Sequence, residues 1–252
     1  SMKSEQWWTG PGQYNFDPVD TKIFDALDFN PDILVLPIVW AAPPLWWRDV
    51  HPDEMAKFTS GETWDYYKSA HCFASDIWKH DAAEALTALV RHAETASYAS
   101  RILGYWIVGG VSAEWQGWGC HSSCEKAHLM DCSRPETEAF RRFLQGKYPG
   151  QDAAFAEVDI PSYEERTAAE LGVFRDPVAA ERCVDFVEFY SESMADAILN
   201  CAGAVKAAVD RAKIVGIYFG YSLEYSNMSW AFQMSGHNRL RKVLDSPDVD
   251  FL

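Results

Sequence analysis

The chain has 252 residues, and its 22 Lys and Arg against 37 Asp and Glu give a formal net charge of −15 at pH 7. A surface this acidic repels phosphate backbones and no local basic patch offsets it, so we expect no nucleic-acid partner. No apolar run approaches the roughly 20 residues that a membrane span needs, so we expect no membrane partner. Without a signal peptide the expected location is cytoplasmic. Ser1 and Met2 look like a tag remnant, and 48% hydrophobic residues suffice for one domain over 1–252.

In chain order, apolar runs alternate with amphipathic segments. A helix is predicted over residues 20–28 and a continuously apolar strand over residues 33–40. Residues 41–75 form an irregular stretch that is too long for a simple connection, so we expect it to carry function. A helix with one apolar face is predicted over residues 76–95.

The second half of the chain continues this alternation. Its predicted elements are a strand over 102–110, a helix over 135–147, a partly helical stretch over 158–177, a helix over 179–212, a strand over 213–220, a short helix over 236–244 and the start of a strand at 249–252. The strand over 33–40 lacks polar alternation and is expected to be buried on both faces, as in parallel sheets. The order of elements therefore predicts an α/β fold with parallel strands.

Aromatic residues are abundant, with 11 Trp, 11 Tyr and 14 Phe. Many of the tryptophans lie beside Gly, Pro or polar residues rather than inside apolar periodic runs. A flat amphipathic ring at a loop mouth can stack on the apolar face of a sugar. Ordinary core packing is the alternative interpretation, and composition alone does not decide between them.

Two of the six cysteines, Cys183 and Cys201, fall inside a predicted helix and are expected to be small buried apolar groups. Near the middle of the chain, thiols and imidazoles gather at Cys120, His121, Cys124, His128 and Cys132. These residues would suffice for zinc, but they lack the paired C-x-x-C spacing of a specific zinc signal. We therefore expect free thiols, no metal and no cofactor, with a structural zinc module as the alternative.

Ligands of parallel α/β sheets lie at the carboxyl ends of the strands, and Glu114 follows the strand over 102–110 within a few residues. It stands between Ala113 and Trp115. Partial desolvation by aromatic neighbours would raise the pKa of this carboxyl and let it act as a general acid in glycosidic cleavage. A loop glutamate paired with an arginine is the alternative.

Further polar residues follow the later strands. Glu224 comes after the strand over 213–220 and is a candidate second carboxylate, with a substrate contact or a salt bridge as alternatives. His237, Asp248 and Asp250 surround the last helix and strand, where a capping or solvated role is the default expectation.

Several short segments together resemble glycoside hydrolase family 42, the clan A β-galactosidases and their relatives. These segments are residues 12–17 (GQYNFD), 33–46 (ILVLPIVWAAPPLW), 51–54 (HPDE), 102–115, 140–148, 214–224 and 249–252. The resemblance covers nearly the whole chain. It implies a (β/α)8 TIM barrel and assigns only strands three to six of that barrel to this chain.

The resemblance also implies roles for individual residues. Glu114 would be the catalytic acid/base, and the nucleophile, a glutamate that ends the seventh strand in this clan, is expected outside this segment. The residues expected to contact a carbohydrate substrate are Trp40, Trp46, Trp115, Tyr221 and Glu224. By the same resemblance, the helix over 135–147 follows the loop that binds zinc in some members.

The chain departs from the family pattern at important positions. Ala113 stands where clan A enzymes usually carry Asn, no arginine precedes Cys72 in the family manner, and the later thiols do not reproduce the tight cysteine spacing. Four strands cannot close a barrel and their open edges are unstable alone, so we expect further strands or a homo-oligomer. A non-catalytic carbohydrate-binding or structural fragment is the alternative function.

Overall fold

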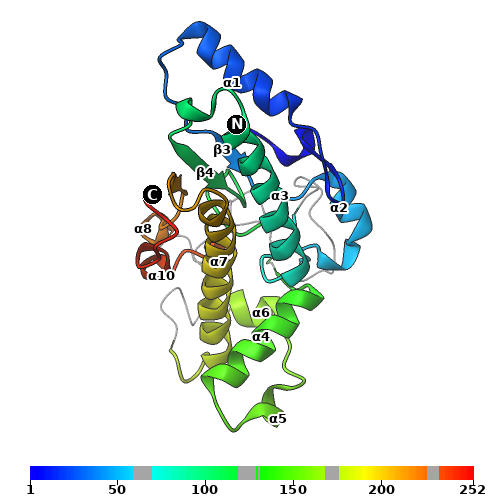
Figure 1. The fold of residues 1–252 in the computed structure, drawn as a ribbon. Coiled ribbons are helices and arrows are strands. Elements are labelled where there is room, and N and C mark those ends of the chain that lie inside the picture. Colours follow the sequence, from blue (N-terminus) through cyan, green and yellow to red (C-terminus); the bar gives the residue numbers. More distant parts are fainter. Residues whose placement is uncertain (59–69, 119–128, 130, 168–175, 226–232) are drawn as a thin grey trace.

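The computed structural model describes residues 1–58, 70–118, 129, 131–167, 176–225 and 233–252 (Figure 1). At the N-terminal end, a short 3₁₀ turn, Ser4–Gln6, leads into a hairpin of β1 (Trp8–Gly10) and β2 (Gln13–Tyr14). The sequence analysis did not predict this hairpin. Gly12, with φ of +62°, adopts the left-handed conformation in its turn.

Three parallel strands form the sheet, in the order β3 (Ile38–Trp40), β4 (Gly104–Val108) and β5 (Ile214–Gly216). Single parallel bridges extend it on both sides, from Met2 to β3 and from Phe251 to β5. The prediction of parallel strands is confirmed, and Phe251 lies where a strand over 249–252 was expected. Met2 is buried and exchanges backbone hydrogen bonds with β3, although its sequence looks like a tag remnant.

The two faces of the sheet differ in burial. On one face lie the fully buried side chains of Val39, Tyr105, Ile107, Val215 and Ile217. They pack against α3 (Asp76–Thr95) and α7 (Glu181–Ala208), which run side by side along this face (Figure 1). The Tyr105 hydroxyl donates a hydrogen bond to Glu94 of α3 across 2.8 Å.

On the opposite face Val108 is fully buried, whereas five further side chains are half-buried: Ile38, Trp40, Trp106, Tyr218 and Phe251. The ring of Trp106 lies 4.5 Å from that of Tyr218 and 5.0 Å from that of Phe251, measured between centroids. The expectation of burial on both faces is therefore wrong for the strand over 33–40, because Ile38 and Trp40 are only half-buried. A continuous apolar run did not distinguish a fully covered strand from one whose second face is half-buried.

The remaining helices surround this centre. They are α1 (Asp17–Phe29), α2 (Leu45–Val50), α4 (Arg134–Lys147), α5 (Asp152–Phe155), α6 (Tyr163–Thr167), α8 (Ser222–Tyr225) and α10 (Leu240–Leu244), with 3₁₀ turns at Pro52–Glu54 and Ala99–Arg101. A second apolar cluster of Phe140, Phe186 and Phe189 joins α4 to α7. Within the described part of the chain, no helix has the length and apolarity to cross a membrane.

Candidate active site

The loop that follows β4 folds back on itself and presents Glu114. The Val111 N–H donates to the Gln116 carbonyl across 3.0 Å, and the Trp115 N–H returns to the Gly109 carbonyl across 2.8 Å. Gly110 has φ of +64°, and a Cβ there would lie 2.3 Å from the Gln116 carbonyl oxygen. Only glycine therefore fits where this loop closes.

Three residues of this loop that are not glycine adopt left-handed backbone conformations. The φ angles are +56° at Ser112, +70° at Ala113 and +52° at Trp115. Each such residue costs about 1–2 kcal/mol, and backbone strain of this kind clusters at functional sites. Ala113 bears this strain without the local side-chain hydrogen bonds that make Asn more tolerant of it.

Glu114 lies between the strained residues Ala113 and Trp115 and is half-buried. Its Oε2 accepts a hydrogen bond of 2.6 Å from the Nε2 amide of Gln116, which is itself fully buried. The amide donor fixes the direction of the carboxyl group while leaving it partly exposed. This geometry suits a group that must meet a ligand.

His237 joins the loop after β4 to the turn after β5. Its Nδ1 accepts the backbone N–H groups of Gly220 and Tyr221, each across 3.0 Å, and its Nε2 lies 3.1 Å from the Trp115 carbonyl. The ring is fully buried, and this burial lowers the pKa of His237 to about 4. A neutral imidazole with a proton on Nε2 satisfies all three contacts. The expectation of a capping or solvated role for His237 is therefore wrong.

Tyr221, in the turn after β5, lies within electrostatic reach of both Glu114 and Glu224. Burial raises the pKa of the Tyr221 hydroxyl, and the negative charges of Glu114 and Glu224 add to this rise. Both carboxylates therefore act on the same phenol. Glu224 is exposed in α8, whereas Tyr221 is half-buried.

The three tryptophans expected at a sugar surface have different surroundings. Trp40 ends β3 and is half-buried. Trp46 is half-buried and donates its Nε1–H to the Trp8 carbonyl across 2.9 Å, so it packs on the N-terminal hairpin. Trp115 is fully buried, with its Nε1–H bonded to the Ile107 carbonyl across 3.0 Å. A ring enclosed in this way packs the loop onto β4 and does not present a face to a ligand.

Two aromatic residues that the sequence analysis did not select, Trp106 and Tyr218, lie on the half-buried face of the sheet. The alternation of side chains along β4 is the signal that would have found Trp106, since its neighbours Tyr105 and Ile107 point to the opposite face. His237 had no comparable signal, because its contacts join segments more than a hundred residues apart.

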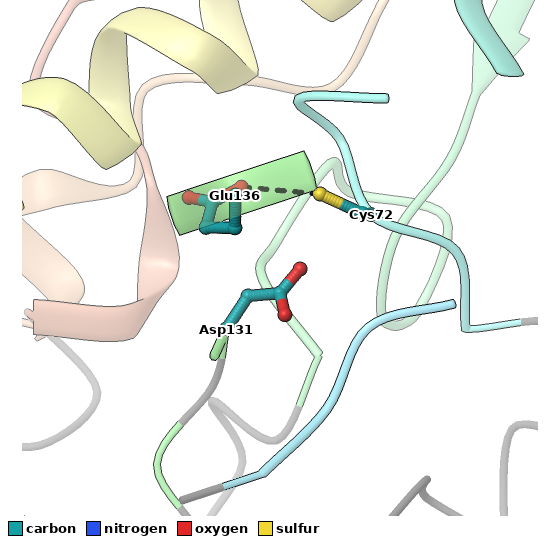
Figure 2. Close-up of side chains that lie close together, drawn as sticks. All are labelled: Cys72, Asp131 and Glu136. Atoms are coloured by element: carbon teal, nitrogen blue, oxygen red, sulfur yellow. Dashed lines mark hydrogen bonds between the residues drawn. The ribbon is translucent and has the colours of Figure 1, made fainter. Parts of the chain in front are cut away.

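A separate buried cluster contains groups that could bind a metal. Cys72, Asp131 and Glu136 offer one thiol and two carboxylates within 4.8 Å of one another (Figure 2). Burial raises the pKa of both the Cys72 thiol and the Glu136 carboxyl. Cys183 and Cys201 are buried, as predicted, whereas Cys120, His121, Cys124 and His128 lie outside the described residues.

Comparison with known proteins gives a match to one family and matches to several solved structures. Residues 9–239 match the family described as β-galactosidase, glycoside hydrolase family 42. A search of curated protein sequences gives no match.

Among solved structures, the β-amylase catalytic domain of Paenibacillus polymyxa has a TM-score of 0.73 at 16% identity, over 97% of this chain and 67% of that one. The β-galactosidase of the psychrophilic Marinomonas ef1 has a TM-score of 0.57 at 16% identity, and the match covers 85% of this chain and 32% of that one. That of Bacillus circulans sp. alkalophilus has a TM-score of 0.59 at 14% identity, over 93% and 34%. The chain thus spans about a third of these β-galactosidases, and the fold is part of a (β/α)8 barrel, as predicted.

Proposed function

Because the chain belongs to glycoside hydrolase family 42, we propose that it carries the acid/base half of a glycosidase that acts on β-galactosides or related β-glycosides. Glu114 is the acid/base. Tyr221, Glu224 and Trp40 contact the sugar, and Trp46 contributes at the margin. Trp115 is left out of this set because its ring is enclosed.

The observation that carries this proposal is the strained loop that holds Glu114 at the carboxyl end of β4. Strain at Ser112 and Ala113, a hydrogen bond from a buried amide and the bridging His237 together fix one partly exposed carboxyl group. A structure retains strain of this kind only where its surroundings over-determine the geometry. Placement at the carboxyl end of a barrel strand is typical of catalytic residues.

The chemistry needs Glu114 in both protonation states. Its proton passes to the glycosidic oxygen as the bond from that oxygen to the anomeric carbon breaks, and the resulting carboxylate then takes a proton from the attacking water. A second carboxylate is also required, about 5–5.5 Å away in retaining enzymes. We place this nucleophile outside residues 1–252.

The test supplies that carboxylate from solution. The full chain is assayed with p-nitrophenyl and 2,4-dinitrophenyl β-D-galactosides in the presence of sodium formate. We expect Glu114→Gln to slow the p-nitrophenyl substrate by about 10²–10⁴-fold, the usual worth of proton transfer. The dinitrophenyl substrate is expected to slow far less, because its leaving group departs without a proton.

The matched control is Glu224→Gln, which removes an exposed carboxylate on the neighbouring turn. We expect Glu224→Gln to raise the KM of both substrates and to leave the ratio of their cleavage rates unchanged. Equal slowing of both substrates by Glu114→Gln would contradict an acid/base role. Sugar binding by calorimetry without any turnover in formate would overturn the catalytic proposal in favour of a carbohydrate-binding function.

A further inference from the structure

A fully buried glutamine contacts the carboxyl group of the proposed acid/base. The Gln116 Nε2–H donates to Glu114 Oε2 across 2.6 Å, and Gln116 itself has no exposed surface. Hydrogen bonds to a carboxylate are shorter than those between neutral groups and about twice as strong. Gln116 therefore acts on the charge of Glu114 as well as on its direction.

The backbone holds this amide in a fixed position. The Gln116 carbonyl accepts the Val111 N–H across 3.0 Å, and the next residue, Gly117, donates its N–H to the Ser235 carbonyl across 3.1 Å. A Cβ at Gly110 would lie 2.3 Å from the Gln116 carbonyl oxygen, so the two ends of the loop pack closely together. The amide therefore reaches the carboxyl group from a point that the closed loop defines.

The contact makes the two carboxyl oxygens of Glu114 unequal. In a protonated carboxyl group the carbonyl oxygen is the better hydrogen-bond acceptor, so the proton resides on Oε1 while Oε2 accepts the amide N–H. After the proton leaves, the same N–H faces a negative charge, which strengthens the hydrogen bond. The amide of Gln116 therefore favours the ionised form of the carboxyl group.

Three other ionisable side chains belong to the same region. Burial and the negative charges of Glu114 and Glu224 raise the pKa of the Tyr221 hydroxyl, so this phenol is uncharged near neutral pH. Burial lowers the pKa of His237 to about 4, so its ring is also uncharged there. Glu224 is exposed, and water screens its charge. Gln116, in contrast, acts on Glu114 through direct contact.

We propose that Gln116 is a positioning residue for the acid/base reaction: its amide assigns the transferable proton to Glu114 Oε1 and stabilises the carboxylate that remains. This inference rests on the proposed glycosidase function. In the first step, the proton on Oε1 passes to the glycosidic oxygen, which takes both electrons of its broken bond to the anomeric carbon. In the second step, Oε1 takes a proton from the water whose oxygen bonds to that carbon, and Oε2 keeps its amide donor throughout.

An amide that faced Glu114 with its oxygen would have the opposite effect. Only a protonated carboxyl group could donate to that oxygen, so the neutral form would be favoured. Removal of the amide would then ease the ionisation of Glu114 instead of hindering it. The direction of the change on mutation of Gln116 therefore tests the proposal, and a purely structural role would give no change in either direction.

The first test follows the ionisation of Glu114 by carbon-13 NMR of the full chain with labelled glutamate carboxyl groups, so it does not require turnover. The Glu114 signal is the one that is absent in Glu114→Gln. Gln116→Met, which has a similar size and no donor, should raise the pH midpoint of this signal by about one unit, a tenfold change in the ionisation constant. Gln116→Glu should raise it further, because a second carboxylate repels the first.

Gln233→Met is the matched control for the loss of a buried amide. Gln233 is also a buried glutamine, and its Nε2–H donates to the Arg166 carbonyl across 2.9 Å. It lies two residues before Ser235, whose carbonyl accepts the Gly117 N–H, so it belongs to the segment that contacts the end of the loop. We expect Gln233→Met to leave the Glu114 midpoint unchanged.

Turnover gives a second measurement that a purely structural role would not change. In formate, cleavage of p-nitrophenyl β-D-galactoside should fall at high pH as Glu114 loses its proton. In Gln116→Met this fall should move to higher pH by the same amount as the NMR midpoint. The dinitrophenyl substrate should show no such fall, because its leaving group departs without a proton.

A further measurement does not depend on how variants at position 116 fold. In the nitrogen-15 spectrum of the wild-type chain, one glutamine side-chain amide should shift with the same midpoint as the Glu114 carboxyl group, and this shift should vanish in Glu114→Gln. Absence of such an amide, an unchanged or lowered midpoint in Gln116→Met, or an equal rise in Gln233→Met would overturn the role of Gln116. A raised midpoint in Gln116→Met without any turnover in formate would instead support the contact and contradict the glycosidase function, so the two failures are distinguishable.

Discussion

His237 shows how a single buried side chain can set the geometry of two loops. Its ring accepts two backbone N–H groups from the turn after β5 and contacts the Trp115 carbonyl in the loop after β4. A tilted contact with the Phe219 ring, at 4.4 Å between centroids, holds the imidazole in place. Because Glu114 precedes Trp115 directly, the position of the proposed acid/base depends on a residue that need not touch substrate.

This role predicts a specific loss of stability in acid. Burial lowers the pKa of His237 from its ordinary value of 6.5 to about 4, so the unfolded chain takes up a proton at higher pH than the folded chain does. The stabilisation is complete above pH 6.5 and is lost as pH falls toward 4. The whole loss is about 3 kcal/mol, at 1.36 kcal/mol for each pKa unit.

Urea unfolding at pH 7.5 and 4.5 measures this effect. The wild-type chain should lose about 2–3 kcal/mol more than His237→Gln between these pH values, because glutamine does not titrate. His80→Gln is the control, since His80 lies on the exposed side of α3 with 70% of its side chain accessible. An identical pH dependence in wild type and His237→Gln would refute the assignment.

Glu114 could be selected from sequence because it directly follows an apolar strand, and that signal is local. The burial of the Trp115 ring could not be predicted from such a local signal. Its enclosure depends on Gly109, whose missing Cβ leaves room for the ring; a Cβ there would lie 2.9 Å from it. The loop-mouth rule for tryptophan fails here because the loop turns back onto its own strand.

At the scale of secondary-structure elements, the long helices were predicted well and the short strands less well. Ser75 caps α3 and its apolar face is regular, so the predicted bounds 76–95 match Asp76–Thr95. The strand predicted over 33–40 is regular only from Ile38, since Pro37 has no N–H to donate to a ladder. The helix predicted over 179–212 ends at Ala208, before two left-handed residues, Asp210 and Arg211.

Two glycines make a matched prediction about how elements pack. A Cβ at Gly117, just after the proposed acid/base loop, would lie 2.0 Å from the Met234 carbonyl oxygen and 2.4 Å from the Tyr190 hydroxyl. Gly117→Ala should therefore destabilise the chain by about 1–3 kcal/mol, as overpacking does. A Cβ at Gly146 in α4 would meet nothing within 4 Å, so Gly146→Ala should stabilise by up to about 1 kcal/mol.

Thermal and urea unfolding of both variants provides the measurement. Gly117→Ala should also slow glycoside cleavage, because the Gly117 N–H donates to the Ser235 carbonyl two residues before His237. Gly146→Ala should leave cleavage unchanged. Equal stability changes in the two variants would contradict this prediction, because the segment around Met234 would then move aside without any loss of stability.

For the whole molecule, the unequal faces of the sheet give a physical basis to the expected homo-oligomer. The helix-covered face is closed, whereas Trp106, Tyr218 and Phe251 form a half-buried aromatic layer on the other. A barrel interior is normally filled by layers of side chains from all its strands. We expect a second copy of the chain to cover this layer in solution.

Sedimentation equilibrium at micromolar concentration tests this expectation against the chain mass of 28.5 kDa. Two copies that each carry a net charge of −15 repel one another, so association should strengthen as salt rises toward 0.15 M, where the Debye length is about 8 Å. Trp106→Ser should shift the population toward monomer. Val178→Ser, at a position that is 87% exposed, should not. A monodisperse 28.5 kDa species at every salt concentration would contradict the homo-oligomer, because an uncovered aromatic layer would then be stable in water.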